Sequence, residues 1–372
     1  MVGEQLEKLK VMVVEDSSFY KKILVQAVED TGLGLVEHTA SSSSILFERL
    51  KQRKIDVVLL EFRMREMSGI DILKNLRIDY PDVYVIMVSA GKAGSVAGTA
   101  KALEMGALDF ILKPMEVDAK RSVIMIKNRL QGLFTQIITV KYTTGNASAV
   151  NLAETAKLAF QHPPAPGRQV AEKKKLSGVD LIVIAASTGG PVALETICKK
   201  LPADFNKPIL VVQHMPAEFT RKLAQSLDKK CALPVVEAEE GALVKPGQVM
   251  IAPGGVHMTV QTGSEAGRTF KLKAAPPVNG VRPSADVLFS SVAKAYKGRR
   301  VLAVILTGMG SDGMLGVKEM KRTCTCYCLV QSEKTCVVHG MPKSVVDAGL
   351  ADDVEDIDAI TARVLCLVRG GS

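Results

Sequence analysis

Three polar residues follow apolar runs in the second half of the chain, and their types are those of nucleophilic catalysis. Ser187 stands in a Ser-Thr-Gly-Gly turn after the apolar residues 181–186, where the glycines let a substrate approach the backbone closely. His214 follows the run 209–213, and Asp312 lies in a glycine-rich segment after the run 301–306. A nucleophile, a general base and an acid that orients the base are what acyl transfer requires.

Each residue of this set also has a simpler interpretation. A serine before two glycines is common in turns, and a histidine at a strand end is often structural. Segment 308–313 also matches the G-x-G-x-x-G pattern of dinucleotide-binding domains, with Glu333 lying 20 residues beyond Gly313. Only 39 residues follow Glu333, however, and a dinucleotide site would leave Ser187 and His214 unexplained. We therefore favour hydrolysis over dinucleotide binding.

A second cluster of polar residues is expected in the first third of the chain. Its members stand at the ends of apolar runs: Glu15, Asp16, Glu61, Ser89 and Lys113. Clustered carboxylates repel one another unless a hard cation neutralises them, so Glu15, Asp16 and Glu61 are the expected ligands of a Mg²⁺ ion. Lys113 could balance the charge of an acyl phosphate, and the Ser89 hydroxyl could donate to one of its oxygens.

Both clusters require parallel sheets, because the carboxyl ends of parallel strands meet at one edge of a sheet. Short Val, Ile and Leu runs alternate with helical periodicity over residues 1–130 and again over residues 179–372. We predict an α/β fold of two doubly wound parallel-sheet domains, joined by a linker at 131–178. The proline-rich residues 161–167 and the lysine run 173–175 mark that linker.

The composition of the 372 residues excludes several classes of protein. With 47% hydrophobic and 23% charged residues, each domain can bury an ordinary core, which excludes a disordered or fibrous chain. The net charge is +9, but the densest run of basic residues lies in the predicted linker. Aromatic residues make up only 4%, so we expect no nucleic-acid binding. No apolar run reaches the ~20 residues of a membrane span, and the first residues do not resemble a signal peptide. We expect a cytoplasmic protein without membrane insertion.

The seven cysteines form neither a disulfide framework nor a pair of zinc knuckles. Three of them, Cys324, Cys326 and Cys328, alternate along the chain, which places them on one face of a strand. We interpret the cysteines as buried core thiols in a reducing compartment.

Residues 8–125 resemble a response-regulator receiver domain, which implies a flavodoxin-like fold. The resemblance rests on Glu15-Asp16, Ser89-Ala90, Lys113-Pro114 and segment 67–69. That family's phosphoacceptor is an aspartate, whereas this chain has Glu61 at the position. The added methylene displaces the carboxylate, and in-line attack on a phosphoryl group tolerates little misplacement. We therefore expect Glu61 to be a poor phosphoacceptor; the chemotaxis histidine kinase is an implied partner, but we do not expect ordinary phosphotransfer from it.

Residues 179–365 resemble the chemotaxis protein-glutamate methylesterases of the CheB family, which implies a Rossmann-like sandwich for the second domain. The matching segments are 186–191, 213–216 and 307–313, with support from 251–254, 282–284, Cys336 and 340–343. The order of receiver, linker and esterase also matches.

This second resemblance implies a mechanism and a substrate. Ser187 would attack a glutamyl methyl ester on a chemoreceptor, His214 would take its proton, and Asp312 would orient the imidazole. The backbone N–H of Met309 would donate in the oxyanion hole, and His257 would contact the substrate. The hydrolysis needs no cofactor, and receptor glutamines are a second implied substrate. A catalytically weak regulatory adaptor, the remaining alternative, would need a broken triad, whereas this one is intact.

Overall fold

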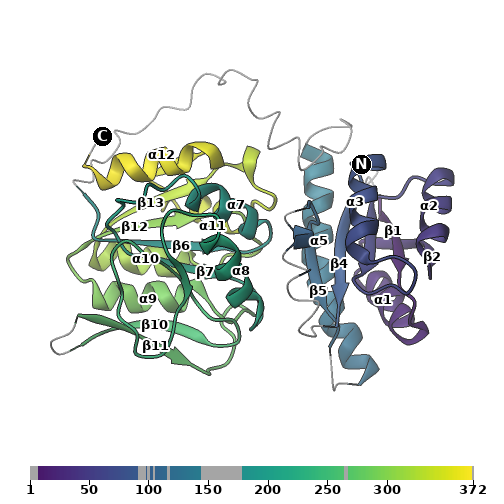
Figure 1. The fold of residues 1–372 in the computed structure, drawn as a ribbon, viewed down its shortest axis with the longest axis horizontal. Helices are drawn as coiled ribbons and strands as arrows, with labels where there is room; N and C mark the ends of the chain where they lie inside the picture. The colour runs from purple at the N-terminus through teal and green to yellow at the C-terminus, as the bar shows by residue number, and fades with distance from the viewer. Residues whose placement is uncertain are drawn as a thin grey trace, which may run out of the picture. The chain divides into compact units, whose positions relative to one another are not determined.

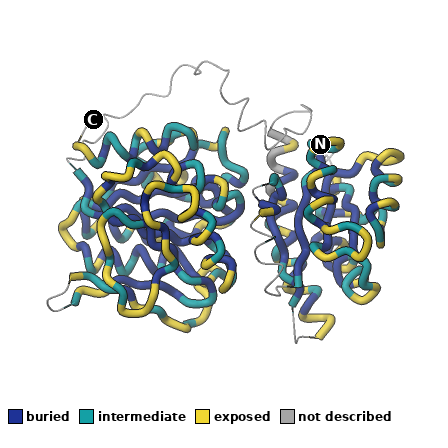
Figure 2. The backbone as a smooth tube through the Cα atoms, viewed as in Figure 1, coloured by how far each residue is buried: buried dark blue, intermediate teal, exposed yellow. Residues whose placement is uncertain are grey.

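The structure is a computed structural model that describes residues 7–90, 98, 101–103, 105–114, 118–143, 178–263 and 267–370. The chain divides into two compact units, residues 1–158 and 159–372 (Figure 1). Each unit has strands that are buried and loops and helix faces that are exposed (Figure 2). The proline-rich and lysine-rich segments of the predicted linker lie outside the described residues.

The first unit is built on five parallel strands. They are β1 (Leu9–Val14), β2 (Gly34–Ala40), β3 (Val57–Glu61), β4 (Tyr84–Ser89) and β5 (Asp109–Leu112). Their order in the sheet is β2-β1-β3-β4-β5, so the chain crosses from one side of β1 to the other after β2. This is a doubly wound sheet, and the carboxyl ends of β1 and β3 lie side by side.

Serine side chains begin three helices of this unit. Ser17 caps α1 (Ser18–Asp30), Ser42 caps α2 (Ser43–Gln52) and Ser68 caps α3 (Gly69–Asp79), each by accepting a hydrogen bond from a backbone N–H of the first turn. The last helix, α5 (Ala119–Thr143), runs through residue 130, where we expected the first domain to end. Its Leu133 and Phe134 are fully buried, so the apolar face of the helix continues beyond that boundary.

The second unit contains seven parallel strands and one antiparallel hairpin. The parallel strands are β6 (Leu181–Ala186), β7 (Ile209–Gln213), β8 (Val235–Glu237), β9 (Val249–Ile251), β12 (Arg300–Ile305), β13 (Thr325–Gln331) and β14 (Asp353–Glu355), in the order β14-β13-β12-β6-β7-β9-β8. The hairpin pairs β10 (His257–Thr262) with β11 (Arg268–Lys273). Both parallel sheets confirm the predicted α/β class.

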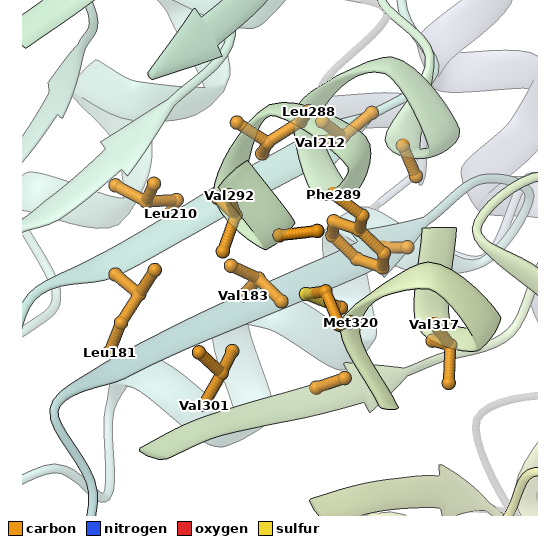
Figure 3. Packing of buried hydrophobic residues seen from close by; sticks show 14 of the residues in the cluster. Leu181, Val183, Leu210, Val212, Leu288, Phe289, Val292, Val301, Val317 and Met320 are labelled. Atoms are coloured by element: carbon orange, nitrogen blue, oxygen red, sulfur yellow. The ribbon is translucent and has the colours of Figure 1, made fainter. Parts of the chain in front are cut away.

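Helices cover both faces of the seven-stranded sheet (Figure 1). They are α7 (Gly190–Cys198), α8 (Phe219–Asp228), α9 (Ala285–Ala295), α10 (Met314–Thr323), α11 (Gly340–Asp347) and α12 (Ile357–Val368), with a short 3₁₀ turn at Glu333–Thr335. Figure 3 shows side chains of α9 and α10, among them Phe289 and Met320, packed on Val183 and Val301 of the sheet. Burial of these side chains fixes α9 beneath the centre of the sheet.

The three alternating cysteines lie in this same core. Cys324 and Cys328 belong to the buried cluster, and Cys326 packs against it. The prediction that they are core thiols is confirmed.

Candidate active site

The three predicted catalytic residues follow three adjacent strands. β12, β6 and β7 are neighbours in the sheet, and Ser187, His214 and Asp312 lie beyond their carboxyl ends. After β6 the chain winds through β7 to one side and later returns through β12 on the other. The crevice at such a reversal is where doubly wound sheets hold their ligands.

Ser187 is held by its backbone in a turn that leaves its hydroxyl without a partner in the described residues. Its N–H donates to the carbonyl of Thr307 at 3.0 Å. Its own carbonyl accepts from the N–H of Gly190 and from Nε2 of Gln213, each at 2.8 Å. The N–H of His214 donates to Ala186 at 3.1 Å, so the histidine leaves its strand directly beside this turn. Ser187 is thus tied to the segment after β12 and to the end of β7.

His214 and Asp312 form a buried pair. Nε2 of the imidazole lies 2.7 Å from Oδ2 of the carboxylate, and the two side chains are 6% and 3% exposed. An ionised carboxylate only accepts hydrogen bonds, so Nε2 of His214 carries the proton and Nδ1 has the free lone pair. Nδ1 is therefore the nitrogen that can act as a base.

Four further donors surround the Asp312 carboxylate, and three of them come from the start of α9. They are the Ser284 hydroxyl at 2.7 Å, the Ala285 N–H at 2.6 Å, the Asp286 N–H at 3.1 Å and Nδ2 of Asn279 at 2.9 Å. A helix N-terminus favours negative charge because its first N–H groups have no partner within the helix. From the sequence we expected Asp312 near the end of a strand. In the structure its carboxylate also accepts hydrogen bonds from the N-terminus of α9.

These contacts decide the charge of Asp312. Burial alone would raise its pKa. The hydrogen bonds from His214 and Ser284 and from the Ala285 N–H outweigh burial and lower the pKa of Asp312 to about 2. The carboxylate is therefore ionised at neutral pH, as an acid that orients and supports an imidazolium must be.

Asn279 and Asp286 belong to the site, although the sequence analysis did not select them. Nδ2 of Asn279 bridges Oδ2 of Asp286 and Oδ1 of Asp312 at 2.8 and 2.9 Å. Oδ1 of Asp286 accepts from the N–H groups of Gly313 and Gly316 at 3.0 and 2.7 Å, which fixes the segment after Asp312. Burial, followed by the nearby Asp312 charge, raises the pKa of Asp286. Asn279 has φ of 54°. The only feature of the sequence that could have drawn attention to Asn279 is the Asn-Gly dipeptide, which is typical of a turn.

Met309 lies in a loop that is anchored on both sides while its own N–H has no acceptor in the described part of the chain. The N–H of Gly308 donates to Val338 at 2.9 Å. The Gly308 carbonyl accepts from Gly340 and Met341 at 3.0 and 2.8 Å. A fixed, unused backbone donor beside a serine is what stabilisation of an oxyanion requires.

Comparison with known proteins bears on this arrangement. Residues 182–364 match the CheB methylesterase family, and residues 11–124 match the response regulator receiver domain family. The chain is 38% identical to a protein-glutamate methylesterase/protein-glutamine glutaminase of Oleidesulfovibrio alaskensis, over 96% of this chain and 98% of that one. A protein of the same name from Desulfotalea psychrophila is 36% identical, over 98% of this chain and all of the other. The chain belongs to the CheB family.

A solved structure is also similar to part of the chain. The crystal structure of the Thermotoga maritima CheB methylesterase catalytic domain is 42% identical, covers 51% of this chain and 100% of its own, and aligns with a TM-score of 0.49. The family matches confirm the sequence-based assignment of both domains to their families. None of the described helices is long and apolar enough to cross a membrane.

Both ring nitrogens of His257, the expected substrate contact, have partners within the protein. It is 1% exposed, its Nε2 pairs with the carbonyl of Pro276 at 3.0 Å, and its Nδ1 accepts from the N–H of Ser284 at 3.2 Å. The strand β10 that begins at His257 belongs to the hairpin and not to the parallel sheet, so its residues do not end at the crevice. His257 thus accepts from Ser284, a donor to Asp312, and its expected contact with substrate stays a prediction.

A hollow of about 800 Å³ lies beside the Asp312 network. Asn279 and Asp286 form part of its wall, together with Lys273 and Lys294 from the hairpin and from α9. The three predicted catalytic residues do not line this hollow.

The receiver cluster forms in part. Nζ of Lys113 lies 2.6 Å from Oε2 of Glu15 and also pairs with Glu61, and all three side chains are buried. Ser89 is fully buried at the end of β4, and its carbonyl accepts from the Lys113 N–H at 2.7 Å. Asp16 lies apart, 3.4 Å from the exposed Arg65 guanidinium. Burial, which outweighs the attraction of Lys113, raises the pKa of Glu15.

The predicted Mg²⁺ ligands do not fit the ion as they are arranged. Oε1 of Glu15 accepts from the Ser17 N–H at 3.0 Å, and Oε1 of Glu61 accepts from the Arg63 N–H at 2.8 Å. Within the described residues no group of three His, Cys, Asp or Glu side chains could hold a metal ion. In this arrangement the Lys113 ammonium supplies positive charge to Glu15 and Glu61, and Mg²⁺ binding stays a prediction.

Proposed function

We propose that this CheB-family chain hydrolyses glutamyl methyl esters of chemoreceptors and deamidates receptor glutamines, with Ser187 as nucleophile and His214 as base. Relatives of 35–38% identity over nearly the whole chain carry both activities in their names. The cytoplasm is the compartment in which we expect it to act. The observation that carries the assignment of residues is the 2.7 Å pair of His214 and Asp312 beside the Ser187 turn.

The first half of the reaction forms an acyl-enzyme. The Ser187 hydroxyl attacks the carbonyl carbon of the ester while Nδ1 of His214 takes its proton. The Met309 N–H stabilises the oxyanion of the tetrahedral intermediate. The bond to the methoxy oxygen then breaks, and the imidazolium returns the proton so that methanol leaves. With a glutamine substrate, the same proton goes to departing ammonia.

Water completes the second half. His214 takes a proton from the water that attacks the acyl carbon, and Ser187 recovers its proton as the glutamate is released. Asp312 keeps its charge throughout, because its hydrogen bonds hold its pKa at about 2. It orients the ring and supports the imidazolium in both halves.

Methanol release from methylated receptor membranes tests this assignment. We expect Ser187→Ala to reduce the rate to background, while Ser226→Ala, a half-buried serine on α8, keeps the rate of the unaltered chain. A serine-reactive probe should label the unaltered chain and not Ser187→Ala. Labelling that persists in Ser187→Ala, or esterase activity that survives it, would assign the reaction to another residue.

For the first unit, we propose a receiver that works without aspartyl phosphorylation and without Mg²⁺. The support is local: the Lys113 ammonium contacts both Glu15 and Glu61, and the second oxygen of Glu61 is occupied by the Arg63 N–H. Glu61 supplies negative charge near the position that a phosphate would take. The esterase activity is then either independent of phosphorylation or regulated by a partner protein.

A further inference from the structure

Thr307 lies between the nucleophile turn, residues 187–190, and the loop of Met309, and none of the proposed chemical steps uses it. It is 1% exposed and stands two residues beyond β12. Its carbonyl accepts the 3.0 Å hydrogen bond from the Ser187 N–H, and its own N–H donates to Oε1 of Gln331 at 2.8 Å. Since Gln331 ends β13 and Ser187 follows β6, the backbone of Thr307 is held from both strands that flank β12.

The hydroxyl of Thr307 joins two further segments of the chain. Oγ1 lies 2.9 Å from the carbonyl oxygen of Thr188 and 3.2 Å from that of Val338, and it accepts from the Val338 N–H at 2.9 Å. A hydroxyl has only one proton to donate. The Val338 carbonyl already accepts from the Gly308 N–H, so we assign the proton to the shorter contact with Thr188. One side chain thus links the residue after the nucleophile to the segment that holds Gly308.

The methyl group of Thr307 packs against the same turn. A β-carbon on Gly189 would lie 3.2 Å from Cγ2 of Thr307 and 2.6 Å from Cβ of Val337. Gly189 has φ of 78°, a conformation that favours glycine, so the turn closes over Thr307 because position 189 has no side chain. This contact helps to fix the rotamer in which the hydroxyl meets the Thr188 carbonyl.

We propose, on the basis of the roles proposed for Ser187 and Met309, that Thr307 is a positioning residue that keeps the nucleophile and the oxyanion donor at a fixed separation. Its hydroxyl holds the carbonyl of Thr188, directly after the nucleophile, and its backbone continues into Gly308 and Met309. Thr307 acts through these neighbours because it is itself buried. An oxyanion donor works only within hydrogen-bond distance of the developing charge, so a small displacement of either segment weakens it.

Loss of the hydroxyl would act on both segments. Val338 is 2% exposed, and its N–H would lose the acceptor that Thr307 provides. A buried donor without an acceptor is unfavourable, so residues 337–340 are expected to shift until this N–H is paired again. Because the Gly308 N–H donates to the Val338 carbonyl at 2.9 Å, such a shift would reach Met309.

Methanol release by the full chain tests the proposal, with thermal unfolding measured beside it. Thr307→Val replaces the hydroxyl by a methyl group of similar size. We expect its kcat, corrected for the folded fraction, to fall by about 10- to 100-fold with little change in KM. Thr307→Ser keeps the hydroxyl and should retain most of the rate. If Thr307→Val does not fold, Thr307→Ala, which lacks the hydroxyl and adds no bulk, takes its place in the comparison.

Thr361→Val is the matched control. Thr361 is 2% exposed on α12, and its hydroxyl donates to the carbonyl of Ile197, near the end of α7, at 3.3 Å. This variant also loses a buried hydrogen bond, so its Tm is expected to fall, but it should keep the kcat of the unaltered chain.

Three results would overturn the role of Thr307. They are an unaltered kcat in the variant without the hydroxyl, an equal loss of kcat in Thr307→Ser, and an equal loss in Thr361→Val, which would show that kcat follows stability alone. An unaltered chain that releases no methanol, or a Ser187→Ala chain that still releases it, would instead overturn the proposed function and, with it, this role.

Discussion

A β-carbon on Gly308 would lie 2.8 Å from the β-carbon of Ser187 and 3.0 Å from its backbone nitrogen. The sulfur of Met341 stands even closer to the same point. The loop after β12 is therefore pressed against the nucleophile turn, and no side chain fits between them. Because Met309 follows Gly308 directly, this contact sets the distance between the nucleophile and the proposed oxyanion donor.

Gly308→Ala is expected to move the loop and, with it, the Met309 N–H. Losing one oxyanion donor costs about 10²- to 10³-fold in kcat, and overpacking costs about 1–3 kcal/mol of stability. Methanol release and thermal unfolding measure the two effects. Ser311→Ala, an exposed position in the same segment, should change neither. A Gly308→Ala chain with unaltered kcat would show that Met309 is not the donor.

Asp312→Asn should remove the charge that fixes the imidazole. If the amide N–H groups face Nε2 of His214, they favour the wrong tautomer of the imidazole. If they face the start of α9, the buried donors there lose their acceptor. We expect kcat to fall by about 10³- to 10⁴-fold with a small change in KM. Initial rates of the folded variant check this. A large rise in KM at unchanged kcat would instead assign Asp312 to substrate binding.

The same carboxylate makes the catalytic unit sensitive to acid. The pKa of Asp312 is about 2 in the folded chain and about 3.9 when unfolded, so the unfolded state binds the proton more readily. Its stabilisation is complete above about pH 4 and is lost as the pH falls toward 2, an effect of about 2 kcal/mol. Urea unfolding at pH 5 and pH 2.5 measures it. Asp312→Asn should lose less stability over this interval than the unaltered chain; equal losses would contradict the assignment.

Asn279→Ala should weaken catalysis through positioning alone. It removes the amide that bridges Asp286 and Asp312, and a hydrogen bond to a charged group contributes about 1.5–3 kcal/mol. We expect kcat to fall by about 10- to 100-fold with little change in KM. Asn279→Asp adds a third carboxylate and should lower kcat further. If both variants lose stability equally while kcat is retained, Asn279 serves the fold only.

The sequence predicted the proximity of Ser187, His214 and Asp312 better than the residues that support them, for a physical reason. Ser187 and His214 directly follow parallel strands, and Asp312 lies in the loop after a third. The carboxyl ends of parallel strands share one edge of the sheet. Asn279 and Ser284 contact Asp312 across 33 and 28 positions, from an irregular stretch without periodicity. His257 begins a hairpin strand outside the parallel sheet, so the pattern of strand ends does not assign its role. The sequence placed Lys113 in the same cluster as the carboxylates, but it could not show that the ammonium contacts both Glu15 and Glu61.

Glu61→Asp should give the receiver a phosphoacceptor that the unaltered chain lacks. The shorter side chain withdraws its carboxylate from Lys113 toward the position that the receiver family uses. Asp16 remains paired with Arg65 until a cation competes for it. With acetyl phosphate and Mg²⁺, we expect acid-labile labelling at position 61 of Glu61→Asp and a changed esterase rate. The unaltered chain, and Glu66→Asp as an exposed control, should show neither. Labelling of Glu61 itself would show that the Lys113 contacts open to admit a phosphoryl group and that the extra methylene is tolerated. The ordinary phosphorylation switch would then operate.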